Sequence, residues 1–181
     1  MALKTIGTIA IPGSAGSSFD HGAFDPATRR IFVAHTGRDC IEVIDHDGGR
    51  HIATLPGFPK AAGVVADGGE VLVTNRSAAS LAWLDAQTLK TKAVFETGAN
   101  PNGVAVVAKR GLAIVASIGE DGRGAKLEVY ERDSRRRAVA LPGRPRWCVT
   151  DHVGERVFLA IRDPSMILVA ELPDLTGIEH W

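Results

Sequence analysis

The hydrophobic positions of this 181-residue chain fall in short runs that recur at a nearly constant spacing. Four apolar runs set the period, and they are IFVAH at 31–35, VLVTN at 71–75, AIVAS at 113–117 and VFLAI at 157–161. Their starts lie 40, 42 and 44 residues apart. A period of this size over most of a chain is typical of a repeat architecture, in which each unit packs against its neighbours.

Every repeat carries further runs around the first one. A second run ends in an acidic residue, in CIEVID to Asp45, SLAWLD to Asp85, KLEVYE to Glu131 and MILVAE to Glu171. A third run ends in glycine, at Gly57, Gly98 and Gly143, and another, such as AAGVVAD at 61–67, precedes the unit. These runs are short, rich in Val, Ile or Leu, and bounded by turn residues, which favours strands over helices.

Each unit therefore predicts four antiparallel strands, A to D. Units of this kind pack radially as the blades of an all-β propeller. A β-sandwich with an accidental period is the alternative. The recurrence of turn residues together with the hydrophobic runs favours the propeller.

The repeat resembles the YVTN family of β-propeller repeats. The resemblance rests on NPNGVAV at 100–106, VLVTN at 71–75 and IEVID at 41–45, which match that family's entry, second strand and third strand. It extends from Asp20 to Glu171, although His35 and Ile161 stand where the family favours Asn. It implies a propeller fold, and it says little about function because such propellers include enzymes, binding modules and scaffolds.

The whole chain, 1–181, is predicted to be one domain of about four blades. The repeat units cover 20–57, 58–98, 99–143 and 144–171. The tail after Glu171 contains Pro173 and Gly177 and predicts a poor strand. Residues 3–13 (LKTIGTIAIPG) match the strand D pattern, so we expect them to complete the last blade and leave no open edge.

Three assemblies are compatible with four blades. The chain could close as a four-bladed ring, two copies could join half-rings into eight blades, or the chain could be part of a longer protein. Rings of the family that it resembles usually have seven or more blades. We therefore favour a homodimer or a fragment over a closed monomer.

Composition adds mainly exclusions. The 21 basic and 21 acidic residues balance, so no net field favours nucleic acid or an anionic membrane as partner. Cys40 and Cys148 have no metal-binding spacing and predict reduced, half-buried thiols. The N-terminal residues lack the apolar core of a signal peptide, and we expect a cytoplasmic protein.

Propeller geometry indicates where chemistry could occur, because the D–A and B–C loops meet at one mouth of the central channel. The candidate residues in these loops are the possible general bases His21 and His35, the possible ligand contacts Asn100, Arg146, Trp147 and Arg162, and the possible metal ligands Asp20, Asn75 and Asn102. An Arg beside a Trp can hold an anionic or planar ligand. The histidines and asparagines could instead satisfy backbone groups of the turns.

Two functions follow from these candidates. The first is a binding module for a ligand or a protein at the mouth. The alternative comes from a more distant resemblance to the gluconolactonase and senescence-marker-protein propellers. That resemblance implies a lactonase-like hydrolase with a divalent cation such as calcium in the channel, although their inner glutamate ligand has no match here. A structural unit for oligomerisation is a third possibility.

Overall fold

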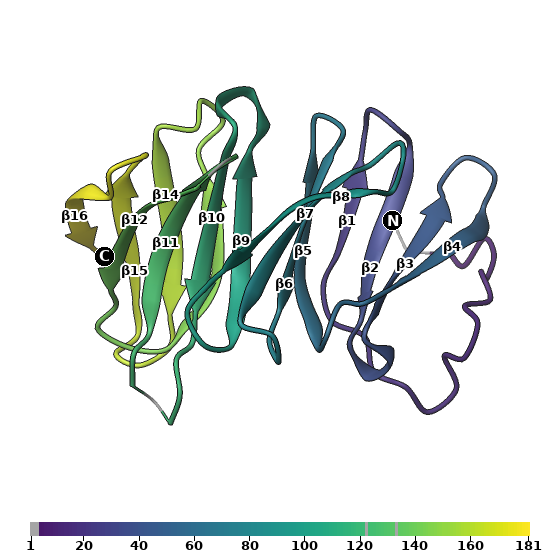
Figure 1. The fold of residues 1–181 in the computed structure, drawn as a ribbon, viewed down its shortest axis with the longest axis horizontal. Helices are drawn as coiled ribbons and strands as arrows, with labels where there is room; N and C mark the ends of the chain where they lie inside the picture. The colour runs from purple at the N-terminus through teal and green to yellow at the C-terminus, as the bar shows by residue number, and fades with distance from the viewer. Residues whose placement is uncertain (1–3, 122, 133) are drawn as a thin grey trace.

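The computed structural model describes residues 4–121, 123–132 and 134–181, except for the side chains of 135 and 136. In these residues, sixteen strands form four antiparallel sheets of four strands each (Figure 1). We call the sheets blades 1 to 4. Blade 1 contains β1 (Gly22–Asp25), β2 (Arg30–His35), β3 (Cys40–Asp45) and β4 (Arg50–Pro56). Blade 2 contains β5 (Ala61–Asp67), β6 (Glu70–Asn75), β7 (Ser80–Asp85) and β8 (Thr91–Glu96). Blade 3 contains β9 (Pro101–Val107), β10 (Leu112–Ser117), β11 (Lys126–Glu131) and β12 (Ser134–Ala140). Blade 4 contains β13 (Pro145–Thr150), β14 (Arg156–Ile161), β15 (Met166–Glu171) and β16 (Thr176–His180).

In the residues that the structure describes, the helical content consists of two 3₁₀ turns, η1 (Thr36–Arg38) and η2 (Ala108–Arg110). No helix in the described part of the chain is long and apolar enough to cross a membrane. The chain is thus an all-β propeller array, as the repeat predicts.

The blades stand side by side in chain order, with blade 1 and blade 4 at opposite ends (Figure 1). Three hydrophobic clusters hold neighbouring blades together: one joins blades 1 and 2, one joins blades 2 and 3, and one joins blades 3 and 4. Among the described residues, no such cluster joins blade 4 to blade 1. The array is therefore open, and its two end faces keep exposed apolar side chains, such as Phe24 at 37% and Val149 at 51%, beside buried ones such as Ile44 and Val169.

The fourth blade differs from its prediction in its outermost strand. The tail, predicted to be a poor strand, supplies β16, which pairs with β15. Residues 4–13 form no strand. Strand D of blade 4 therefore comes from the C-terminal end of the chain, and the expectation that 3–13 would fill this place is corrected.

The first strands of the blades, β1, β5, β9 and β13, contact one another in succession. Glycine permits the closest of these approaches. A Cβ on Gly103 of β9 would lie 2.6 Å from the Arg146 carbonyl oxygen of β13, and Gly63 of β5 likewise faces the Asn102 carbonyl. The glycine of the entry motif thus lets the backbone of the next blade approach, which places the entry segments around one mouth.

Candidate ligand-binding site

The entry segments of blades 1, 3 and 4 and the β6–β7 loop of blade 2 converge at one mouth of the array. Two adjoining cavities of about 440 Å³ each lie there. They share Arg76, Asn102 and Arg146. Their other charged, amide and aromatic lining residues are Asp20, His21 and Trp147 in one cavity and Asn100, Asp121 and Arg144 in the other. We call these nine residues the mouth site.

Arg76 is the central residue of the mouth site, and it was not among the residues predicted from sequence. Its guanidinium lies 2.9 Å from Asp20 Oδ2 and donates a hydrogen bond to Asn102 Oδ1. These contacts tie blade 2 to the entries of blades 1 and 3. Arg76 Nε is buried and lacks a hydrogen-bond partner. Its place directly after the candidate Asn75, in the loop that faces the mouth, was the available signal.

An aromatic stack closes one side of the mouth site. The rings of His21 and Trp147 lie with centroids 4.0 Å apart and planes inclined by 15°. His21 belongs to the entry of blade 1 and Trp147 to β13, so the stack connects the first and last blades across the channel. His21 Nδ1 lies 2.7 Å from Asp20 Oδ1, although it makes no hydrogen bond of suitable direction.

The charge of the mouth site is positive. Three guanidinium groups, of Arg76, Arg144 and Arg146, face the carboxylates of Asp20 and Asp121. Arg76 is paired with Asp20, whereas the side chains of Arg144 and Arg146 make no ion pair or hydrogen bond with any described residue. The exposed Arg146 and the half-buried Trp147 line the same cavity.

Asn100 and Asn102 have mainly structural contacts at the mouth. Asn100 has a left-handed backbone with φ of 52°, a conformation that Asn tolerates better than most residues, and its Nδ2 donates to Gly119 O over 3.0 Å. Asn102 Nδ2 donates to Arg146 O over 3.4 Å. Both residues fix the loops that carry the charged groups.

Six of the nine residues proposed from sequence lie in the mouth site, and three lie elsewhere. His35 is fully buried between strands of blade 1. Asn75 is 3% exposed, and its Nδ2 donates to Ser80 Oγ. Arg162 lines neither cavity, and its amide donates to Arg144 O. Asn75 is thus not gathered with Asp20 and Asn102, and those two metal candidates both contact the Arg76 guanidinium.

A second group of titratable residues lies in blade 1. The carboxylate of Glu42 accepts hydrogen bonds from His35 Nδ1 at 2.7 Å, His51 Nε2 at 2.7 Å and Thr54 Oγ1 at 2.6 Å, and Cys40 Sγ lies 3.5 Å away. His35, Cys40 and Glu42 are close enough to hold a metal ion. Their donor atoms are already engaged with one another, and His35 Nε2 contacts Ser17 Oγ at 2.8 Å.

The matching position in blade 3 shows the structural role of this group. Glu128 occupies the place of Glu42, and it accepts hydrogen bonds from the Gly98 amide and the Ser117 hydroxyl. A buried glutamate there anchors the segment that enters the blade. We therefore interpret the blade 1 group as a hydrogen-bond network.

Both thiols are expected to be unreactive in the folded protein. Burial, reinforced by the nearby Glu42 carboxylate, raises the pKa of Cys40 to about 11, and burial raises the pKa of Cys148 to about 12. Because the thiolate is the nucleophile, a water-soluble disulfide reagent at about pH 8 should label neither residue in the native state. In denaturant the same assay should count two thiols per chain; rapid labelling without denaturant would contradict this prediction.

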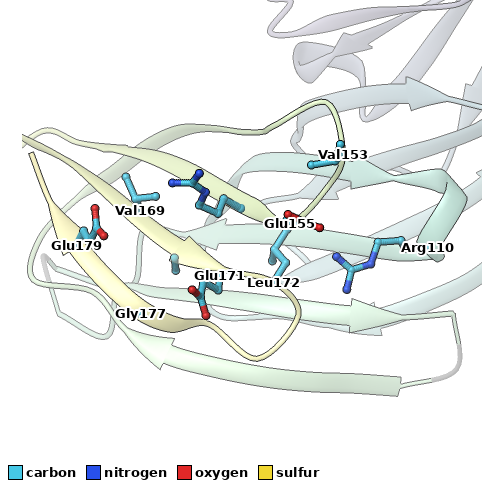
Figure 2. A pocket seen from close by; sticks show the side chains of 10 residues that line it. Arg110, Val153, Glu155, Val169, Glu171, Leu172, Gly177 and Glu179 are labelled. Atoms are coloured by element: carbon cyan, nitrogen blue, oxygen red, sulfur yellow. The ribbon is translucent and has the colours of Figure 1, made fainter.

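A further cavity, of about 630 Å³, lies on blade 4 away from the mouth (Figure 2). Its charged lining residues are Arg110, Glu155, Arg156, Glu171 and Glu179. Figure 2 shows these side chains along β14 to β16 and the end of blade 3. None of the residues proposed from sequence belongs to this cavity.

Comparison with known proteins supports the fold and leaves the family open. No protein-family model matches the chain, and no curated protein matches it in sequence. The structure is similar to a chain of hydrazine synthase from Kuenenia stuttgartiensis, with a TM-score of 0.80, 13% identity and coverage of 95% of this chain and 53% of that one. It is also similar to a chain of a nidogen/laminin complex, with a TM-score of 0.71, 18% identity and coverage of 86% and 60%. The chain thus spans little more than half the length of these structures, and the YVTN assignment stays a prediction.

Proposed function

We propose that this chain is a β-propeller binding module whose mouth site takes a small planar anion. The observation that carries the proposal is the unpaired Arg146 guanidinium beside the stacked rings of Trp147 and His21. A carboxylate of the ligand would pair with Arg146. Its planar part would lie along the aromatic stack, where apolar contact and stacking both contribute.

The surrounding groups favour an anion over a cation. Asp20 is neutralised by Arg76, whereas Arg144 adds a second unpaired positive charge near Arg146. The cavity walls exclude part of the solvent, which strengthens a charged hydrogen bond relative to one on an open surface. The buried, unpartnered Nε of Arg76 is a further donor close to the same space.

A metal-dependent hydrolase is less well supported by this geometry. The Arg76 guanidinium already lies against Asp20 and Asn102, where a cation would have to bind, and Asn75 is engaged elsewhere. Stoichiometric calcium binding, measured by calorimetry and accompanied by hydrolysis of a simple lactone, would overturn our proposal in favour of the hydrolase.

The test uses benzoate as the planar anion and benzamide as its neutral analogue. We expect benzoate to change the tryptophan fluorescence saturably and benzamide to have much less effect. Arg146→Ala should weaken benzoate binding tenfold or more, since hydrogen bonds to charged groups contribute about 1.5–3 kcal/mol. Arg162→Ala is the matched control, because it removes an exposed arginine outside the site.

Equal binding of benzamide, or an equal loss in the Arg162→Ala variant, would contradict the proposed site. Absence of any benzoate response in the wild-type chain would contradict the ligand class.

A further inference from the structure

The two ends of the blade array expose sheet faces of opposite type. We call the face of blade 1 that points away from blade 2 the leading flank, and the face of blade 4 that points away from blade 3 the trailing flank. We propose that the trailing flank of one chain packs on the leading flank of a second copy. Two such contacts would close two chains into one ring of eight blades, with both copies bordering the channel mouth.

The three interfaces inside the chain show what such a contact requires. In each, a row of side chains across the first three strands of one blade meets a corresponding row on the next blade. The rows on the earlier blade are Ala23, Phe32 and Val43; Val65, Leu72 and Trp83; and Ala105, Ile114 and Val129. The rows on the later blade are Ala66, Val71 and Leu84; Val106, Ala113 and Tyr130; and, in blade 4, Val157 and Ala170.

The trailing flank carries a fourth row of the type that the earlier blade contributes to each internal interface. By strand register its members are Val149, Phe158 and Val169. Val149 is 51% exposed, and the neighbouring Trp181, 65% exposed, lies against Phe158 with ring centroids 5.9 Å apart. This face has the apolar character of the three rows that are covered within the chain.

The leading flank carries a row of the type that the later blade contributes to each internal interface, and no preceding blade of the chain packs on it. Its members are Phe24, Ile31 and Ile44, which lie opposite one another in β1, β2 and β3. Phe24 is 37% exposed, whereas its counterparts Ala66 and Val106 pack against the preceding blade. One chain therefore holds one unpaired row of each kind, and a second copy supplies the matching row for both.

A polar contact points to the same partner. Arg30 of blade 1 donates to the carbonyl oxygens of Ala86 and Gln87, in the turn between the third and fourth strands of blade 2, over 2.7 Å each. Glu70, at the same position of blade 2, pairs with Arg132 in the corresponding turn of blade 3 at 2.9 Å.

Arg156 is the residue of blade 4 that corresponds to Arg30. It lies opposite Glu171 in the strand register, as Arg30 lies opposite Asp45. Its side chain lines the large cavity of Figure 2 and makes no hydrogen bond or ion pair with a described residue. In the ring it would reach the turn of the second copy that contains His46 and Asp47. That turn supplies the corresponding backbone carbonyls, and its Asp47 carboxylate, which Arg29 of the same chain already pairs with at 2.6 Å, adds negative charge.

The innermost strands can accommodate this contact. Trp147 stands where blades 2 and 3 have Gly63 and Gly103, so the closing contact differs there from the internal ones. His21 occupies the same position in blade 1, and its amide still donates to Ala62 O of the next blade over 3.3 Å. An aromatic side chain at this position is therefore compatible with close packing of the following blade.

The contact is head-to-tail, because different faces meet. Such contacts close into a ring if the rotation between copies allows it and otherwise extend into chains of molecules. The two copies, with four blades each, would contact each other at two places around one axis. The stack of His21 and Trp147 in one copy would then lie at the same channel mouth as its equivalent in the second copy.

The first experiment is the solution mass of the 181-residue chain, by light scattering after size exclusion. We expect about 38 kDa, twice the 19.2 kDa of one chain. Val149→Arg places a charge in the trailing row and should give about 19 kDa with an unchanged circular dichroism spectrum. Val94→Arg is the matched control, because Val94 is 61% exposed on β8, away from both flanks, and it should leave the mass near 38 kDa.

Mixing two monomeric variants tests the head-to-tail arrangement. Phe24→Glu disables the leading flank and should also be monomeric. An equimolar mixture with Val149→Arg retains one intact flank pair and places Arg near Glu in the other, so the mixture should recover the mass of two chains.

A wild-type mass near 19 kDa, a series of larger assemblies, or a mixture that stays monomeric would overturn the proposal. So would dissociation by Val94→Arg. The result is independent of benzoate binding, since a monomer could still bind benzoate at Arg146 and a dimer could fail to do so.

Discussion

Replacing Glu42 by alanine is expected to lower the free energy of unfolding by about 3–5 kcal/mol. The carboxylate is fully buried, and it accepts hydrogen bonds from His35, His51 and Thr54. Its removal would leave the fully buried His35 and the partly buried His51 without their acceptor, and buried unpaired polar groups are costly. The exposed Thr54 can bond to water instead. Chemical denaturation of the two proteins measures the difference directly.

Two further variants define the origin of this loss. Glu96→Ala removes an exposed glutamate from β8 and should change stability by no more than about 0.5 kcal/mol. Glu42→Gln keeps the shape but offers a single acceptor oxygen, so its loss should be smaller than that of alanine. A stability close to wild type for Glu42→Ala would show that the network contributes little.

The same network gives a pH dependence. Burial acts to raise the pKa of Glu42, but hydrogen bonds from Thr54, His35 and His51 outweigh it and hold the pKa below the ordinary value of 4.5. The unfolded chain therefore binds this proton more readily, so the contribution is complete above that value and is lost as the pH falls through the folded pKa. We expect the stability difference between wild type and Glu42→Gln to shrink as the pH falls below about 4.5. A constant difference would contradict the assignment.

The middle strands of the blades could be predicted from sequence almost residue by residue. The run MILVAE coincides with β15 at 166–171, and VLVTN lies within β6. β6 is buried along its whole length, and β15 is buried over Leu168, Val169 and Ala170, so their apolar character is continuous and easy to recognise. The propeller fold followed from their spacing.

The outermost strand of blade 4 could not be predicted in the same way. All residues of β16 are exposed, so no hydrophobic alternation marks it. It is held by backbone hydrogen bonds, including a reciprocal pair of 2.9 Å between Ile167 and Trp181 beyond its last residue. Backbone pairing is independent of side-chain type, and the pattern in residues 3–13 was therefore a misleading guide.

The location of the mouth site could be predicted from the repeat, but the residues that line it could be predicted only in part. Repeat geometry placed the entry segments correctly, because each starts a strand that lines the channel. His35 and Asn75 end their strands with buried side chains that hydrogen-bond to Glu42 and Ser80 of their own blades, which loop position alone does not reveal. Arg76 was missed because its long side chain reaches two other blades, a contact that sequence spacing does not encode.

Gly103→Ala is expected to destabilise the chain by about 2–3 kcal/mol and to weaken benzoate binding as well. The added methyl group would lie 2.6 Å from the Arg146 carbonyl oxygen and 3.4 Å from the Cys148 amide nitrogen, both in the backbone of blade 4. Backbone cannot rotate away as a side chain can, so β13 must move, and with it Arg146 and Trp147. Gly7→Ala is the control, because nothing lies within 4 Å of its added Cβ and its stability should change by no more than about 0.5 kcal/mol. Denaturation and benzoate titration of both variants test whether the glycine that joins blades 3 and 4 also positions the ligand site, and normal binding by a destabilised Gly103→Ala variant would separate the two roles.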